Sequence, residues 1–381
     1  MKELRFHGEA IVTGRGSIEH LRKLDFKRAF IVTGGESMFK NGTIDKIKAL
    51  LGENGCEVSI YSGIKKNPST DAVMDGLKKM KEFKPDAVIG LGGGSAIDAA
   101  KVMALFYDYP DLNFDNALKK PLPGKRKSIQ FIAIPSTSGT GAEVTKAAVI
   151  TFKSENRKVG LKTTAFIPDI AILDADLTLS MPKNIVAETG MDAMTHAVEC
   201  FINKKLDDFT QCLASGAIEG LFKYLPVSYM TGDINAREKV HNYQCVAGCA
   251  FTNVGLGMDH GISHAIGAAF NMGHGLINAV GLPYVLQFNS RDKEVKEKLD
   301  YLAKRIGKDD FIEAIKEMNR IINIPRSFKE MGIIEKDFED NFETLVNSSM
   351  KGSTEANPVP VTRADMVMVL RKIYEGIDIE Y

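Results

Sequence analysis

Residues 86–101 read DAVIGLGGGSAIDAAK, an apolar run that ends in three consecutive glycines and continues into an alanine-rich segment. The pattern predicts a buried strand over residues 86–90 and a helix over residues 96–105. The glycines let the backbone approach a ligand closely, and the free N–H groups at the start of a helix favour a phosphate. We expect Ser95 to cap this helix, with Asp98 as its third residue. The segment therefore indicates a dinucleotide pyrophosphate site, although a tight turn alone would also require glycine.

Short β-branched runs alternate with helical stretches on both sides of this segment. Such alternation produces parallel strands joined by right-handed crossovers and covered by helices on both faces. We therefore predict a Rossmann-like α/β nucleotide-binding domain over residues 1–179. The expected strands are residues 29–33, 56–61, 86–90, 130–134, 147–151 and 170–173, and the expected helices are residues 44–51, 70–83 and 96–105.

The pattern changes after Pro182, where strand signals largely vanish. Residues 185–201, 209–225 and 237–251 have helical periodicity. The sequence therefore predicts a second, all-α domain over residues 180–381.

The composition favours a small-molecule protein. Lys plus Arg number 49 and so do Asp plus Glu, which leaves no net charge to gather a polyanion, so nucleic acid is not an expected partner. The five cysteines form no CxxC pair, which argues against a disulfide framework and favours a reducing cytoplasm. No apolar leader or run of about 20 apolar residues is present, so we expect neither secretion nor membrane insertion.

A second glycine-rich turn follows the strand expected at residues 130–134. Residues 135–145 read PSTSGTGAEVT and are rich in hydroxyl groups. Ser and Thr are common in loops, but two such turns at the carboxyl ends of parallel strands face one crevice, where open α/β sheets bind ligands. Their combination favours a nucleotide site.

Histidines and a carboxylate recur at helical spacing in the second half of the chain. Asp192 and His196 lie four residues apart, as do His260 and His264, and His274 follows ten residues later. A carboxylate with several imidazoles suits Fe(II) or Zn(II) better than Ca(II) or Mg(II). Because the group contains no cysteine, a structural zinc site is not expected. The pattern indicates a catalytic metal centre.

Four segments occur in an order that resembles one enzyme family. They read GGGSAIDAAK (residues 92–101), IPSTSGTGAEVT (134–145), TGMDAMTHAVE (189–199) and GLGMDHGISHAIGAAFNMGHG (255–275). The chain resembles the iron-containing (group III) alcohol dehydrogenases, of the lactaldehyde reductase and butanol dehydrogenase type. The resemblance implies the dehydroquinate synthase-like fold, with an α/β nucleotide domain before an all-α metal-binding domain. We also expect a homodimer or a larger homo-oligomer.

The resemblance implies a role for each residue of the histidine pattern. Asp192, His196, His260 and His274 would be the metal ligands, with Fe(II) favoured and Zn(II) as a possible substitute. His264 would lie near the nicotinamide and the substrate as a catalytic residue that takes part in proton transfer.

The chain departs from the family where the first strand ends. NAD-using members carry an Asp there, whereas residues 32–37 of this chain read VTGGES. An Asp would bind the ribose 2′-hydroxyl and repel a 2′-phosphate, so Gly34 favours NADP(H) over NAD(H), unless Glu36 turns in and restores the repulsion. A second departure is Ala265, where close relatives have Pro. The positions expected to contact the cofactor are Gly34, Gly35, Ser37, Asn67, Gly93, Gly94, Ser95, Asp98, Ser136, Thr137, Thr140, Thr145 and Lys158.

These features predict reversible hydride transfer between NADP(H) and a small to medium primary alcohol or aldehyde. The residues that the resemblance places near the substrate are apolar, namely Ala147, Val149, Phe251, Leu256 and Pro360. Two alternatives stay open at this point. A non-redox metal-dependent lyase of the same fold would need basic residues around an acidic substrate, and a non-catalytic metal-binding module would show no affinity for a dinucleotide.

Overall fold

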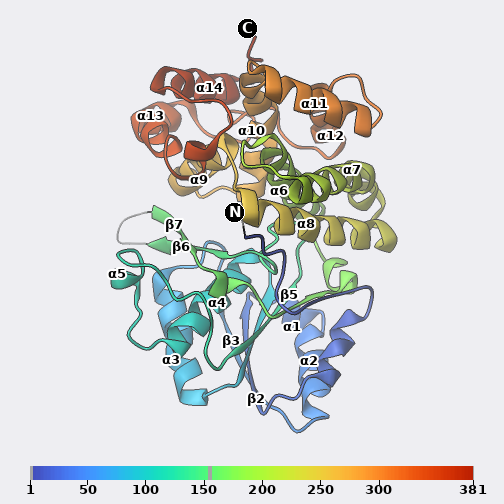
Figure 1. The fold of residues 1–381 in the computed structure, drawn as a ribbon, viewed down its shortest axis with the longest axis vertical. Helices are drawn as coiled ribbons and strands as arrows, with labels where there is room; N and C mark the ends of the chain where they lie inside the picture. Colours follow the sequence, from blue (N-terminus) through green and yellow to red (C-terminus); the bar gives the residue numbers. More distant parts are fainter. Residues whose placement is uncertain (1–2, 153–156, 381) are drawn as a thin grey trace. The chain divides into compact units, whose positions relative to one another are not determined.

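The computed structural model describes residues 3–152 and 157–380 (Figure 1). The chain forms two compact units, Met1–Met181 and Pro182–Tyr381, which we call the first and second units. The sequence places the boundary between residues 179 and 180.

The first unit contains a six-stranded sheet in which every pair of neighbouring strands is parallel. All six residues of β4 and five of the six in β5 are buried, as expected for apolar strands covered on both faces. The predicted α/β fold is confirmed. In spatial order the strands are β1 (Ala10–Thr13), β8 (Ile170–Leu173), β5 (Gln130–Pro135), β4 (Ala87–Gly92), β2 (Arg28–Gly34) and β3 (Glu57–Ile64).

Helices cover both faces of this sheet (Figure 1). Alternate residues of β2 point to opposite sides, so that Phe30 packs in the cluster with α3 and α4, while Ile31 packs in the cluster with η1 and α2. The helical segments of the first unit are η1 (Ser17–Lys23), α1 (Ser37–Lys40), α2 (Thr43–Gly52), α3 (Thr70–Phe83), α4 (Gly94–Asp108), α5 (Phe114–Ala117), η3 (Thr164–Phe166) and η4 (Ala175–Thr178).

The strand expected at residues 147–151 forms outside the main sheet. It is β6 (Ala147–Phe152), which pairs antiparallel with β7 (Arg157–Lys162) in a separate two-stranded sheet. Thr151 also donates its backbone N–H to the carbonyl of Pro68 at 2.8 Å, which joins this hairpin to the turn after β3.

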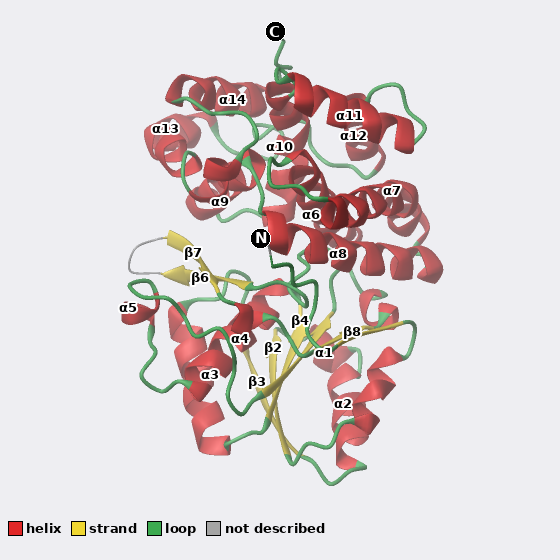
Figure 2. Ribbon diagram, in the orientation of Figure 1, coloured by secondary structure: helices red, strands yellow, loops and turns green. Residues whose placement is uncertain are grey.

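The second unit is helical throughout its described residues (Figure 2). The three predicted helices fall within α6, α7 and α8, and aspartates cap the first turns of α7 and α8. No described helix in either unit combines the length and apolar character needed to cross a membrane. The helical segments of the second unit are α6 (Lys183–Ile202), α7 (Asp208–Thr231), α8 (Ile234–Val254), α9 (Met258–Phe270), α10 (His274–Asn289), α11 (Lys293–Arg305), α12 (Phe311–Ile321), α13 (Glu335–Ser349), η5 (Gly352–Ala356) and α14 (Arg363–Glu375).

Candidate active site

Three of the predicted metal ligands meet in the second unit. One ligand atom each from Asp192 on α6, His260 on α9 and His274 at the start of α10 lie within 4.8 Å of one another. The Asp192 Oδ1 atom is 3.9 Å from His260 Nε2 and 3.7 Å from His274 Nε2. Ligands about 2.0–2.2 Å from one tetrahedral ion are separated by about 3–4 Å, so these atoms can coordinate a single cation.

His196 lies beside this group, one turn after Asp192 on α6. Its ring centroid is 4.5 Å from that of His260, and its ring stacks on Phe251 with a centroid distance of 4.2 Å. Among the described residues, the set of atoms close enough to share an ion consists of Asp192, His260 and His274. The role of His196 as a fourth ligand therefore stays a prediction.

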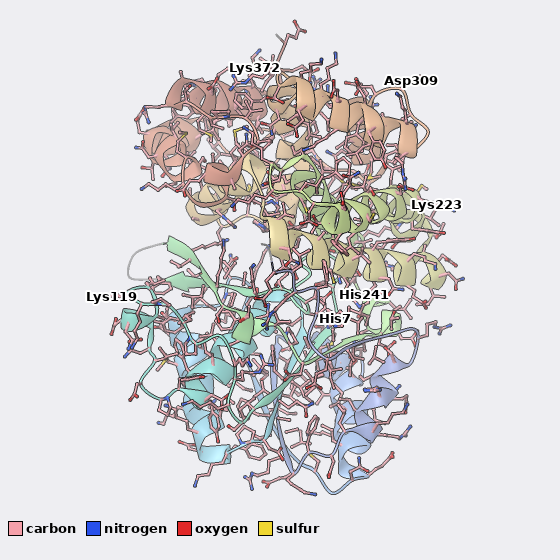
Figure 3. All side chains as sticks on the ribbon, viewed as in Figure 1. His7, Lys119, Lys223, His241, Asp309 and Lys372 are labelled. Atoms are coloured by element: carbon pink, nitrogen blue, oxygen red, sulfur yellow. The ribbon has the colours of Figure 1, made fainter. Side chains whose placement is uncertain are left out.

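His264 also borders the group, one turn after His260 on α9. Its ring is stacked on that of His274 at a centroid distance of 5.2 Å and lies 6.3 Å from that of His260. Another histidine, His241 on α8, is fully buried outside the group, whereas His7 in the first unit is exposed (Figure 3).

The electrostatics of the three-residue group suit a cation. Burial raises the pKa of Asp192 to about 7, against the opposing effect of a hydrogen bond from Asn278. Burial, and then the neighbouring His196 and His264, lower the pKa of His260 well below its usual value. The group thus offers a neutral imidazole at His260 and a carboxylate whose charge needs compensation. This donor set fits a borderline divalent cation such as Fe(II) or Zn(II).

The two glycine-rich turns of the first unit, one after β4 and one after β5, pack against each other. A Cβ atom added to Gly94 would lie 2.9 Å from the side chain of Thr140, and one added to Gly93 would lie 3.4 Å from that of Thr137. The two turns can be this close at residue 94 because it has no side chain, whereas a Cβ at residue 93 would make an ordinary contact. The expected convergence of the two turns is therefore present at the carboxyl ends of β4 and β5.

The capping arrangement predicted for this turn is wrong. Gly93 is the N-cap of α4, in an extended conformation, and Ser95 is already the second residue of the helix. The Asp98 carboxylate instead accepts a hydrogen bond from the backbone N–H of Val149 at 2.9 Å. Since Gly93 has no side chain, it leaves the first N–H groups of α4 available to a phosphate.

Lys101 joins α4 to the hairpin strand β6. Its Nζ donates to the carbonyl and hydroxyl oxygens of Thr145, at 3.0 and 3.1 Å, and to the carbonyl of Ala147 at 2.8 Å. The side chain is buried, which lowers its pKa to about 8. Thr145, Ala147 and Val149, three of the predicted contact positions, are therefore held against the helix that begins at the glycine turn.

The end of β2 is shaped by two glycines. A Cβ at Gly34 would lie 2.8 Å from the carbonyl oxygen of Ile64, and Gly35 has a φ of 51°, in the left-handed region. Ser37 is the first residue of α1. The exposed Glu36 side chain pairs with Lys40, one turn along the chain.

Asn67 and Lys158 lie at the junction of the hairpin with the turn after β3. Asn67 has a φ of 57°, and Lys158 pairs in register with Thr151, which is bonded to Pro68. Burial and the neighbouring Lys66 lower the pKa of Lys158. An anionic ligand would relieve the repulsion between these two cations.

Comparisons with known proteins match both units of the chain. Residues 8–175 match the family described as iron-containing alcohol dehydrogenase, and residues 186–374 match the C-terminal part of the same family. The chain belongs to the iron-containing alcohol dehydrogenases. The predicted family is confirmed, and so is the prediction of an NAD(P)-dependent oxidoreductase.

Relatives of this iron-containing alcohol dehydrogenase cover most of its length. It is 39% identical over 383 residues to the NADPH-dependent butanol dehydrogenase of Clostridium saccharobutylicum, covering 97% of this chain and 98% of the relative. It is also 39% identical over 296 residues to the 1-propanol dehydrogenase PduQ of Citrobacter freundii, covering 77% and 75%. The iron-containing alcohol dehydrogenase structure from Thermococcus thioreducens superposes with a TM-score of 0.91 at 32% identity, covering 99% of this chain and 100% of that one.

The residues predicted to line the substrate site lie in both units. Ala147 and Val149 belong to β6 in the first unit. In the second unit Phe251 stacks on His196, while the carbonyl of Leu256 accepts from Asn203 and that of Pro360 from Arg291. Phe251 thus contacts one of the histidines of this dehydrogenase directly.

The structure adds three polar residues that sequence reasoning missed. Glu199 Oε2 lies 2.6 Å from His260 Nδ1, and Ser263 Oγ lies 2.8 Å from His274 Nδ1. Asn278 donates to Asp192 Oδ1 at 2.7 Å. Partners of this kind orient metal ligands and select the free imidazole nitrogen. Two of the three could have been suspected from their positions in the sequence, because Glu199 ends a family motif and Asn278 follows His274 by one turn.

Proposed function

We propose that this iron-containing alcohol dehydrogenase transfers a hydride reversibly between NADP(H) and a small to medium primary alcohol or aldehyde. Fe(II) would be held by Asp192, His196, His260 and His274, with Zn(II) as a possible substitute. The observation that supports this most strongly is the grouping of a buried carboxylate and two imidazole nitrogens within 4.8 Å, in a chain of this family.

The chemistry divides between the cation and the cofactor. When bound, the cation would polarise the substrate oxygen and ease loss of the alcohol proton, and the nicotinamide would accept or return the hydride. Asp192 would contribute the negative charge of the donor set, and His260 and His274 would contribute imidazole nitrogens. The Phe251 ring, stacked on His196, places an apolar surface beside this proposed ligand.

His264 is the proposed proton carrier. Its ring is half-buried and stacked on that of His274, which places an imidazole beside the metal group. In the proposed reaction this imidazole would take the hydroxyl proton of the alcohol and pass it outward. In the direction of aldehyde reduction the same nitrogen returns the proton.

NADP(H) is the proposed cofactor because the end of β2 carries no carboxylate at position 34. Glu36, the residue that could have restored the repulsion, is paired with Lys40 and exposed. The N–H of Gly35 and the hydroxyl of Ser37 are the donors proposed for the 2′-phosphate. The C. saccharobutylicum relative is described as NADPH-dependent, which supports the same choice.

An apolar substrate is proposed from the five apolar side chains expected at the substrate site. Relatives named butanol dehydrogenase and 1-propanol dehydrogenase support short aliphatic substrates. No basic side chain is among those five positions, which disfavours the lyase alternative with its acidic substrate.

The five cysteines, all present as free thiols, support a reducing compartment such as the cytoplasm.

The test is a set of assays on protein purified without oxygen. We expect bound iron, an increase in NADPH fluorescence on binding, and reduction of aldehydes of two to six carbons that is lost on treatment with a chelator. A metal-binding module would hold iron without changing NADPH fluorescence. Unchanged aldehyde reduction after complete metal removal would contradict the proposal.

A further inference from the structure

Helix α9 carries His260 near its start, yet its N-cap is Gly257, which has no side chain to satisfy the first backbone N–H groups. Other helices of this unit use an aspartate N-cap, for example Asp207 before α7 and Asp233 before α8. An acceptor for the first turn of α9 must therefore come from another part of the unit.

Two side chains supply acceptors there. Asn357 Oδ1 accepts the backbone N–H of Met258 at 3.1 Å, and Glu199 on α6 serves the N–H groups around it. Glu199 Oε1 accepts the backbone N–H of Asp259 at 2.7 Å, and the N–H groups of Gly257 and His260 face the same carboxylate. A Cβ on residue 257 would lie 2.9 Å from this oxygen, so the glycine makes the approach possible. A negative charge at this position also interacts favourably with the positive end of the helix dipole.

The other oxygen of the same carboxylate holds the imidazole. Glu199 Oε2 is 2.6 Å from His260 Nδ1, and both side chains are 1% exposed. The side-chain NH₂ of Asn278, which can only donate, lies 3.2 Å from His260 Nε2, so Nε2 is the accepting nitrogen and Nδ1 carries the proton donated to Glu199. The lone pair of a neutral His260 is then on Nε2, the atom that faces Asp192 Oδ1 at 3.9 Å.

We propose that Glu199 is the positioning residue of the metal centre. One oxygen caps α9 and the other fixes the position and tautomer of His260, so that Nε2 is presented as a ligand. The carboxylate comes from α6, two turns after Asp192, and a single helix therefore carries one ligand and the support of another. The inference depends on the proposed role of His260 as a ligand.

Glu199→Gln separates the two roles. The glutamine oxygen can accept from the backbone N–H of Asp259 or from His260 Nδ1–H, but its NH₂ group cannot accept from the other. If the oxygen keeps capping α9, His260 Nδ1 must accept from the NH₂ group, so the ring takes the opposite tautomer with its proton on Nε2. If the oxygen faces Nδ1–H instead, the NH₂ group opposes the N–H of Asp259, and the start of α9 that carries His260 loses its cap. Either arrangement disturbs the presentation of Nε2. The matched control is Glu343→Gln on α13, which removes an exposed carboxylate paired with Arg363.

The experiment measures Co(II) binding to metal-free full-length protein, by its visible absorption and by competition with a chromophoric chelator. We expect Glu199→Gln to bind Co(II) about 10- to 100-fold more weakly than wild type, with an altered spectrum and an unchanged far-UV circular dichroism spectrum. Glu343→Gln should bind as wild type does, and His260→Ala should lose most binding.

Each other outcome overturns part of the reasoning. Wild-type affinity and spectrum in Glu199→Gln would remove the positioning role and leave the metal site intact. Unfolding of Glu199→Gln would assign the carboxylate to fold stability alone and would also overturn the proposal. Failure of wild type to bind Co(II), or full binding by His260→Ala, would contradict the proposed metal site itself, and the role of Glu199 with it.

Discussion

Cofactor choice can be tested at Gly34 with a pair of substitutions, Gly34→Ala and Gly34→Asp. The structure shows why the aspartate alone would mislead, since any Cβ at this position lies 2.8 Å from the carbonyl oxygen of Ile64. That carbonyl must shift in both variants, at a cost of about 1–3 kcal/mol. The difference between the two variants therefore isolates the carboxylate.

The difference in kcat/KM for NADPH between the two variants can be estimated from Coulomb's law. A carboxylate about 5 Å from a 2′-phosphate of about two negative charges is disfavoured by about 1.7 kcal/mol at the dielectric constant of water, and by more where the site is shielded. Since about 1.4 kcal/mol is a factor of ten, kcat/KM for NADPH should be at least about 10-fold lower in Gly34→Asp than in Gly34→Ala. The kcat/KM for NADH should rise or stay constant, because the carboxylate can bind the ribose 2′-hydroxyl.

The assay compares kcat/KM for both cofactors in wild type, Gly34→Ala and Gly34→Asp, at one saturating aldehyde concentration and fixed ionic strength. Wild type should prefer NADPH, and the preference should survive in the alanine variant. Equal cofactor ratios in the two variants would refute the reasoning from charge. A wild-type preference for NADH would show that another group controls the choice, while the metal site would be unaffected.

Two further predictions concern His264 and Lys101. His264→Ala should retain its metal, lower turnover by about 10²- to 10⁴-fold and alter the pH profile of kcat; loss of metal would instead make His264 a ligand. Burial lowers the pKa of Lys101 from 10.5 to about 8, so above pH 8 the unfolded chain binds a proton that the folded one does not, and folding stability should rise with pH. In urea unfolding, wild type should gain up to about 1.4 kcal/mol per pH unit relative to Lys101→Met between pH 8 and 10, and parallel curves would contradict this.

Much of the sheet could be predicted because its central strands are continuous apolar runs. The runs that became β2, β4, β5 and β8 were expected, whereas β1 and β7 were not. Strand β1 is four residues long at the edge of the sheet and only half-buried, so its pattern is weak. Strand β6 was expected, but nothing local to it predicts its antiparallel partner. The cap of α4 was misassigned because Gly93 adopts a capping conformation without a capping side chain.

Within the candidate site, the sequence predicts which residues share a helix face, but it does not predict contacts between residues far apart in the chain. Asp192 and His196, like His260 and His264, share a helix face by their four-residue spacing, so the sequence alone pairs them. Glu199 reaches His260 across 61 residues of sequence. Such a contact depends on how α6 and α9 pack, and a single sequence with no pairing signal cannot predict it.

The most direct measurement is a titration of metal-free protein with Fe(II) under anaerobic conditions, following aldehyde reduction by NADPH. Activity should rise linearly and reach a plateau at one Fe(II) per chain, while His260→Ala and His274→Ala, folded by circular dichroism, should recover little activity at the same additions. Full activity before any metal is added, or full recovery in either histidine variant, would contradict the assignment of the group formed by Asp192, His260 and His274 as the catalytic metal centre.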